Sequence, residues 1–143
     1  MAMRPKVPPR KGKKDHRRRV SESHIRMIRQ MPCILSGREA EAAHVSYGDL
    51  EAGKPGNAMG LKASDDYAVP LCPELHRLNN GSQHHSEINE RDWWAQFGIN
   101  PIEIAQQLFA VGRNYEAMLA IVNNIKLTPA ARDRVMAILR GEK

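Results

Sequence analysis

Apolar residues recur at helical spacing in the last third of the chain. The segment NPIEIAQQLFAVG, residues 100–112, places Ile104, Leu108 and Val111 on one stripe, between an Asn-Pro start and a glycine stop. The segment TPAARDRVMAILRG, residues 128–141, repeats this order of capping residue, proline and final glycine. Both patterns predict helices that pack through their apolar stripes.

Two more segments of this region predict helices, residues 89–98 and residues 114–124. The first contains Trp93 and Trp94, which we expect to pack in the core rather than to stack on nucleic-acid bases. We find no candidate chemistry in residues 99–143, and we expect them to form a helical C-terminal extension.

The earlier part of the chain has shorter patterns. Residues 21–31 predict a helix that begins at Ser21 or Ser23 and is ended by Pro32. The segments CILSG and EAAHV are typical of two short extended pieces around a turn.

A glycine-rich stretch, residues 46–66, then leads to YAVPL, a short apolar strand. PELHRL follows it and predicts a helix with Pro73 in its first turn and His76 further along. The predicted order is therefore strand, loop, strand and helix. We interpret the glycines as turn-forming, because no strand–loop–helix pattern of a phosphate-binding loop surrounds them.

Positive charge is concentrated at the N-terminus. The whole chain has a formal net charge of +6, whereas residues 1–19 contain nine Lys or Arg against Asp15 alone, which gives +8. The rest of the chain therefore carries −2. Prolines and the lack of apolar residues predict a disordered basic arm over residues 1–20. Such an arm suits binding to a polyanion, most often nucleic acid, or a purely solubilising role.

The overall composition is that of one compact domain with a tail, in a chain of 143 residues. No segment is long and apolar enough to span a membrane, and the basic N-terminus lacks the apolar stretch of a secretory signal peptide. Cys33 and Cys72 make no disulfide framework, although one bond between them is an alternative. We expect a reducing cytoplasm.

Histidine and aspartate gather in the middle of the chain. Clusters of these residue types are typical of metal sites and of acid–base chemistry. The order of elements places the histidine that ends the first strand opposite the histidine on the helix, so that one divalent ion fits between the second strand and the helix. The cluster consists of His44, Asp65, Asp66, His76, His84 and His85.

Together these segments resemble the HNH, or ββα-metal, nucleases over residues 30–98, most closely a branch found in phages and prophages. The resemblance implies an α+β fold with a ββα-metal core at residues 21–98, and a bacterial host cell as the setting. The pieces that match in order and spacing are Ala43-His44, Gly60-Leu61-Lys62 with Asp65, Val69-Pro70-Leu71-Cys72, His76-Arg77, Gln83-His84, Trp93-Trp94 and Gly98-Ile99-Asn100-Pro101.

The resemblance implies a chemical role for several of these residues. His44 would be the general base that takes a proton from the attacking water. His76 and His84 would bind the metal, and Asp65 would be the acidic partner in catalysis and metal binding. Asp66 and His85 replace Asp65 and His84 if the register differs by one residue.

The implied cofactor is a divalent metal that polarises the scissile phosphate. Oxygen chemistry favours Mg²⁺ or Mn²⁺, while imidazole ligands also accept Zn²⁺ or Ni²⁺. DNA is the expected partner, with no membrane; nothing in the sequence identifies a protein partner. The residues expected to contact DNA are Arg77 and Lys62, with Arg10, Lys11, Lys13, Lys14, Arg17, Arg18 and Arg19 of the arm.

The chain departs from the family pattern at two points. Many members hold a structural zinc ion between two Cys-x-x-Cys knuckles, but here the second cysteine of each pair is replaced, by Ser36 and by Leu75. A Cys₄ zinc site cannot form, and we expect Cys33 and Cys72 to be buried and close to each other. Many members also have a metal-binding residue directly before the general base, where this chain has Ala43.

The predicted function is metal-dependent hydrolysis of phosphodiester bonds in DNA. One alternative is a non-catalytic nucleic-acid-binding protein on a degenerate HNH fold. The other is a structural zinc module that acts as an adaptor between proteins. Catalysis would separate the enzyme from both alternatives.

Overall fold

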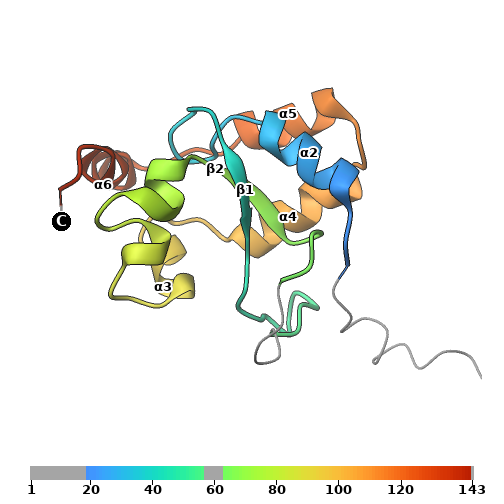
Figure 1. Cartoon of the computed structure of the whole chain (residues 1–143), viewed down its shortest axis with the longest axis horizontal. Helices are drawn as coiled ribbons and strands as arrows, with labels where there is room; N and C mark the ends of the chain where they lie inside the picture. The colour runs from blue at the N-terminus through green and yellow to red at the C-terminus, as the bar shows by residue number, and fades with distance from the viewer. Residues whose placement is uncertain (1–18, 57–62, 143) are drawn as a thin grey trace, which may run out of the picture.

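A two-stranded antiparallel sheet lies in the middle of the fold (Figure 1). The computed structural model describes residues 19–56 and 63–142, which form a mixed α+β structure. Strand β1, Glu41–His44, pairs with β2, Ala68–Leu71, so that His44 lies opposite Ala68. All four residues of β2 are buried, as its apolar sequence predicts.

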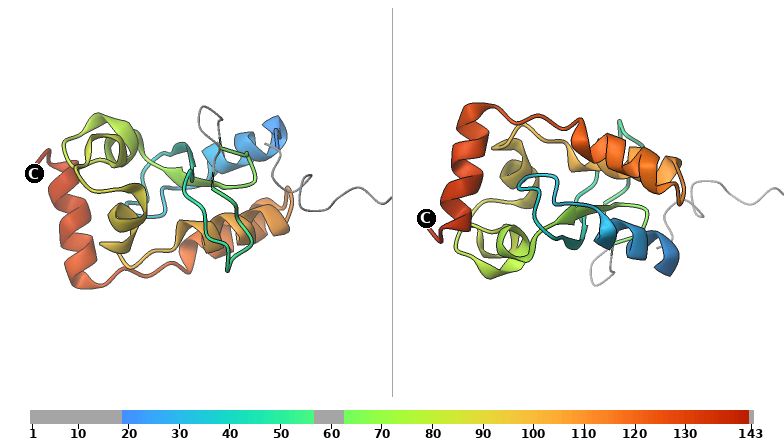
Figure 2. Two further views of the ribbon diagram at one scale, coloured as in Figure 1. Left: turned by 90° about the horizontal axis from the view of Figure 1, so that it is seen from below. Right: turned by 90° about the horizontal axis from the view of Figure 1, so that it is seen from above.

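Helices cover the sheet and extend the molecule to one side. Helix α2, Glu22–Gln30, and helix α4, Pro101–Ala110, pack against the strands, and α5, Tyr115–Asn123, lies beside α4. Helix α3, Glu90–Ala95, follows the histidine-rich segment. Helix α6, Pro129–Leu139, lies at the end of the molecule far from α2 (Figure 2).

Capping side chains begin the helices where the sequence predicts. The Asn100 side chain accepts hydrogen bonds from the amides of the first turn of α4, and the Thr128 hydroxyl does so for α6. Ser21, rather than Ser23, caps α2 by accepting from the amide of His24. Gly112, just after α4, has a φ of 66°, which glycine adopts without strain. These predictions are confirmed.

The C-terminal helices share one hydrophobic core with the sheet. Leu108 and Ile138 belong to the same buried cluster as Val69 of β2. Trp93 and Trp94 are 0% and 1% exposed, so the expectation that they pack is confirmed. The indole N–H of Trp93 donates to the carbonyl of Gly81 at 2.8 Å, which satisfies its polar atom in the core.

The structure confirms one short predicted element and corrects another. PELHRL is helical, as predicted, and takes the form of a single π-helical turn, η1, Glu74–Leu78, closed by a bond from the Asn79 amide to the Glu74 carbonyl. The Asn79 side chain, just after η1, donates to the carbonyls of Ile138 and Leu139 at the end of α6. CILSG, predicted as extended, is a turn in which the Gly37 amide donates to the Cys33 carbonyl at 2.9 Å.

Among the residues that the structure describes, no helix has both the length and the apolar character needed to cross a bilayer.

Candidate functional site

His44 and Asp65 form a hydrogen-bonded pair at the end of β1. The ring Nε2 lies 2.8 Å from Oδ1 of Asp65. The Asp65 side chain is buried, whereas 36% of the His44 side chain is exposed. A carboxylate only accepts hydrogen bonds, so it favours a proton on Nε2 and leaves Nδ1 as the basic nitrogen.

The start of α2 holds Asp65 in place. The Ser21 amide donates to Oδ2 of Asp65 at 2.7 Å. The backbone of Arg19 accepts from the Asp65 amide at 2.7 Å and donates to the Ser64 hydroxyl at 2.8 Å. Arg19, which we placed in the basic arm, is therefore part of the frame around Asp65.

His76 meets a carboxylate from the other end of β1. Its Nδ1 lies 2.7 Å from Oε1 of Glu41. Arg77 also binds Glu41, through Nε at 2.8 Å and Nη2 at 3.1 Å. Burial opposes ionisation of Glu41, but the bonds from Arg77 and His76 lower its pKa below the ordinary value. Burial lowers the pKa of His76, which favours the neutral imidazole that metal binding requires.

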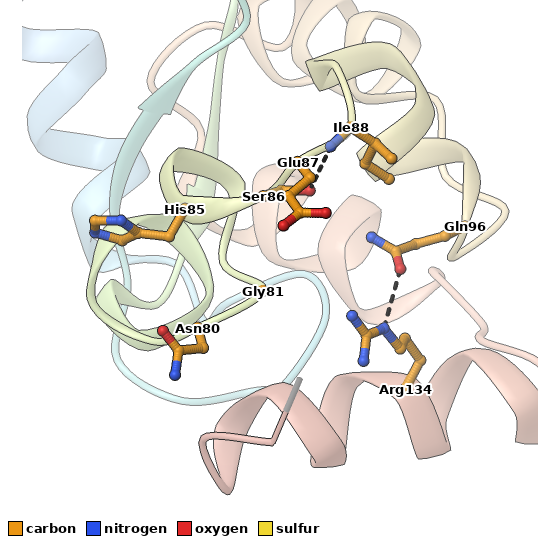
Figure 3. Close-up of a pocket in the computed structure, with 8 residues that line it drawn as sticks. All are labelled: Asn80, Gly81, His85, Ser86, Glu87, Ile88, Gln96 and Arg134. Atoms are coloured by element: carbon orange, nitrogen blue, oxygen red, sulfur yellow. Dashed lines mark hydrogen bonds between the residues drawn. The ribbon is translucent and has the colours of Figure 1, made fainter.

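His84, and not His85, lies against His76. The ring centroids of His76 and His84 are 4.5 Å apart, and His84 lies in η2, a 3₁₀ turn at Gln83–His85. His85 lines a cavity of about 420 Å³ together with Glu87 and Arg134. Its ring points away from Arg134 (Figure 3). The two neighbouring histidines therefore have different surroundings.

The predicted ligands Asp65, His76 and His84 are not gathered into one site. Asp65 is bonded to His44, while His76 is bonded to Glu41, and these two ends of β1 are three positions apart, or roughly 10 Å. Within residues 19–56 and 63–142, no three His, Cys, Asp or Glu side chains are arranged to hold a metal ion. Asp66, the alternative to Asp65, lies 4.0 Å from the Arg19 guanidinium.

The expected DNA contacts have different surroundings. Arg77 is about half exposed, but its fork is bound to Glu41. The guanidinium of Arg19 lies over the ring of Phe109 at 5.4 Å. The remaining expected contacts lie outside the described residues: Arg10, Lys11, Lys13, Lys14, Arg17, Arg18 and Lys62.

Cys33 and Cys72 are buried neighbours, as predicted. The hydrogen bond between the two thiols lowers the pKa of Cys33 and raises that of Cys72. The Ser36 hydroxyl donates to the Cys72 sulfur at 3.4 Å. Leu75, the fourth position of the two incomplete knuckles, is fully buried.

Glu41 was not among the site residues predicted from the sequence. Its signal was its place on the strand, because residues two apart share a face and Ala43 is 1% exposed. A carboxylate on the same strand face as a buried alanine needs a hydrogen-bonding partner. That partner, His76, comes from a segment 35 residues away and was not evident from local pattern.

The fold and these clusters define a small α+β protein with a carboxylate–histidine pair at each end of one strand. The chain matches a family model described as a protein of unknown function, DUF968, over residues 7–112. That span is well over half of the chain, so the protein belongs to this family. Searches of curated proteins and of solved structures found no match.

Proposed function

We propose that this protein is a metal-dependent endonuclease of the HNH type that hydrolyses phosphodiester bonds in DNA. The observation that carries the proposal is the bond between His44 and buried Asp65, at one end of a strand whose other end meets His76. A partly exposed imidazole held by a buried carboxylate is suited to general-base chemistry.

In this proposal His44 accepts the proton of the attacking water at Nδ1. Asp65 acts through His44, because it fixes the ring orientation and stabilises the imidazolium that forms. Both oxygens of Asp65 already accept hydrogen bonds, from His44 and from the Ser21 amide. We therefore assign Asp65 to the base rather than to the metal.

His76 and His84 fit a divalent ion as two neighbouring imidazoles, one of them oriented by a carboxylate. A metal ion bound there would polarise the scissile phosphate. Two imidazoles with few protein oxygens favour Mn²⁺, Zn²⁺ or Ni²⁺ over Mg²⁺. Ala43 is buried and offers no ligand atom, so further ligands of such an ion would come from water or phosphate oxygens.

The cysteine cluster also supports the resemblance to HNH proteins. In members with two knuckles, four cysteines surround one zinc ion. Here Cys33, Ser36 and Cys72 occupy three of the four equivalent positions and contact one another. We propose that this buried cluster takes the structural place of the zinc site.

The test is incubation of the purified protein with supercoiled and single-stranded DNA, with Mg²⁺, Mn²⁺, Zn²⁺ or EDTA. We expect cleavage that needs a divalent metal and is lost in His44→Ala. Wild-type protein that cleaves neither DNA with any of these metals would overturn the proposal.

One observation favours a non-catalytic DNA-binding protein as the second candidate. Within the described part of the chain, His76 and His84 lie together, but no third His, Cys, Asp or Glu is arranged to bind the same ion. A metal site needs further ligands from the protein or from solvent. This candidate predicts DNA binding of equal strength with and without EDTA, and no cleavage. A zinc adaptor would differ from both, because chelation would unfold it.

A further inference from the structure

We propose that Glu41 is a positioning residue that holds His76 as the Nδ1–H tautomer and so makes Nε2 the nitrogen able to bind a metal ion. The metal step rests on the proposed function. The tautomer, however, is a property of the metal-free protein and is tested separately.

The hydrogen bond from His76 to Glu41 defines the tautomer. Nδ1 and Oε1 are 2.7 Å apart, a distance typical of a charge-assisted bond. Because an ionised carboxylate has no proton to donate, the proton of the bond belongs to the ring nitrogen. Only 13% of the His76 side chain is exposed, so water competes weakly for the same nitrogen.

Arg77 keeps Glu41 ionised and oriented. Its guanidinium binds both carboxylate oxygens, which is the two-point geometry that fixes a carboxylate most firmly. His76 and Arg77, which are consecutive residues of η1, thus both bind the side chain of Glu41 on β1. In this arrangement Arg77 binds Glu41, whereas we had expected it to contact a DNA phosphate.

The bond to Glu41 determines the state of the other ring nitrogen of His76, Nε2. With Nδ1 protonated, Nε2 carries the free electron pair of the ring. The ring of His84 is the neighbouring imidazole, at a centroid distance of 4.5 Å. A carboxylate bonded to the far nitrogen of a metal-binding histidine also raises its basicity, and loss of such a partner typically lowers metal affinity 10–100-fold.

The first experiment measures the tautomer directly in metal-free protein. Protein with ¹⁵N-labelled histidine is studied by long-range ¹H–¹⁵N NMR in the presence of EDTA, and the signals that disappear in His76→Gln identify the ring. We expect wild-type His76 to be the Nδ1–H form. Glu41→Ala should shift it toward the Nε2–H form, and Glu41→Asp should restore the wild-type signals in part.

A matched control is Glu39→Ala, which removes an exposed carboxylate two residues earlier in the chain. It should leave the His76 signals unchanged. An Nε2–H form in the wild type, or the same tautomer in wild type and Glu41→Ala, would overturn the role of Glu41. Thermal unfolding of each variant shows that the comparison is made on folded protein.

The second experiment is calorimetric titration of the same variants with Mn²⁺ and Zn²⁺. We expect Glu41→Ala to bind the metal about 10–100-fold more weakly than wild type, and Glu39→Ala to match wild type. If the tautomer changes as expected but wild type binds neither metal, the role of Glu41 stands and the proposed nuclease function fails. Unchanged metal affinity in Glu41→Ala would overturn the metal step of the inference.

Discussion

His44 and Asp65 are 21 residues apart in the chain, yet their side chains form a hydrogen bond of 2.8 Å, and the start of α2 binds the same carboxylate. The Ser21 amide occupies the second carboxylate oxygen, and Ser21 is at the same time the N-cap of α2. The start of α2 thus fixes the carboxylate of Asp65, which in turn fixes the imidazole of His44 at the end of β1. This kind of support holds a reacting group within the narrow geometry that catalysis requires.

Loss of His44 should affect cleavage and not binding. We expect His44→Ala to lower the single-turnover rate of plasmid nicking by about 10²–10⁴-fold, the usual contribution of a general base. Asp65→Asn should lower the rate while it leaves metal affinity unchanged, because Asp65 contacts the base. His85→Ala is the control. If His44→Ala loses metal and activity together, His44 is a ligand and another group is the base.

His84 and His85, which are consecutive in the chain, should differ in metal binding. His76→Ala and His84→Ala should each lower the affinity for Mn²⁺ or Zn²⁺, because their rings lie together. His85→Ala should have a smaller effect, because His85 lines a separate cavity. Calorimetry and elemental analysis of the three variants make the comparison. Loss of metal in His85→Ala alone would mean that the register of the site is shifted by one residue.

Deletion of residues 1–18 should weaken DNA binding and flatten its dependence on salt. These residues carry eight Lys or Arg and one Asp, and each phosphate contact adds to the salt slope. The deletion stops before Arg19, whose backbone holds Ser64 and Asp65. The measurement is the Kd for duplex DNA at several salt concentrations. An unchanged slope would remove the arm from the interface.

Acid should destabilise the protein through His24. The side chain is 3% exposed, its Nε2 has no hydrogen-bond partner among the described residues, and burial lowers its pKa although Asp65 and Asp66 oppose the shift. The unfolded chain therefore binds a proton more readily than the folded protein. Stability is complete above the ordinary pKa of 6.5 and falls as pH decreases below it, toward the lower folded value.

Urea unfolding between about pH 8 and pH 5 measures this effect in the range where histidine titrates. His24→Leu should give a shallower loss of stability with falling pH than wild type, because it removes the titrating group. His85→Leu, at an exposed position, should keep the wild-type slope. The pKa of His76 is also lowered, so His76 should contribute to the loss of stability over the same pH range. Some dependence of stability on pH is therefore expected to remain in His24→Leu. An identical slope in His24→Leu and wild type would contradict this assignment.

Local sequence signals predicted the helices well, because caps and stops act within a few residues. Asn100, Thr128 and Gly112 each determine where a helix begins or ends without help from distant segments. The same signals predicted a helix at PELHRL but not its π-helical form, and they did not reveal that Asn79, at its end, bonds to α6 about 60 residues later.

Only part of the candidate site could be predicted from the sequence. The resemblance to HNH proteins implied that His44 and Asp65 belong to one site, and the two side chains are bonded. The partner of His76, however, depends on how η1 turns back to β1, which the sequence pattern does not contain. For this reason Glu41 was missed, and Arg77 was assigned to DNA although its guanidinium binds Glu41.

The two incomplete knuckles offer a direct test of the resemblance to HNH proteins. Ser36 already contacts Cys72, and Cys72 contacts Cys33. If these positions retain the geometry of a Cys₄ site, the double variant Ser36→Cys with Leu75→Cys should bind one structural zinc ion. Leu75 is fully buried, so the single change Leu75→Cys should destabilise the fold, and zinc should offset that loss only in the double variant.

Cobalt substitution is the measurement, because four thiolates around Co²⁺ give strong charge-transfer absorption and tetrahedral d–d bands. We expect both signals in the double variant and neither in Ser36→Cys or Leu75→Cys alone. The double variant should also unfold more readily after chelation, since its metal then contributes to folding. A folded double variant that binds no cobalt would show that the cluster does not have knuckle geometry. The resemblance would then rest on the histidine segments alone.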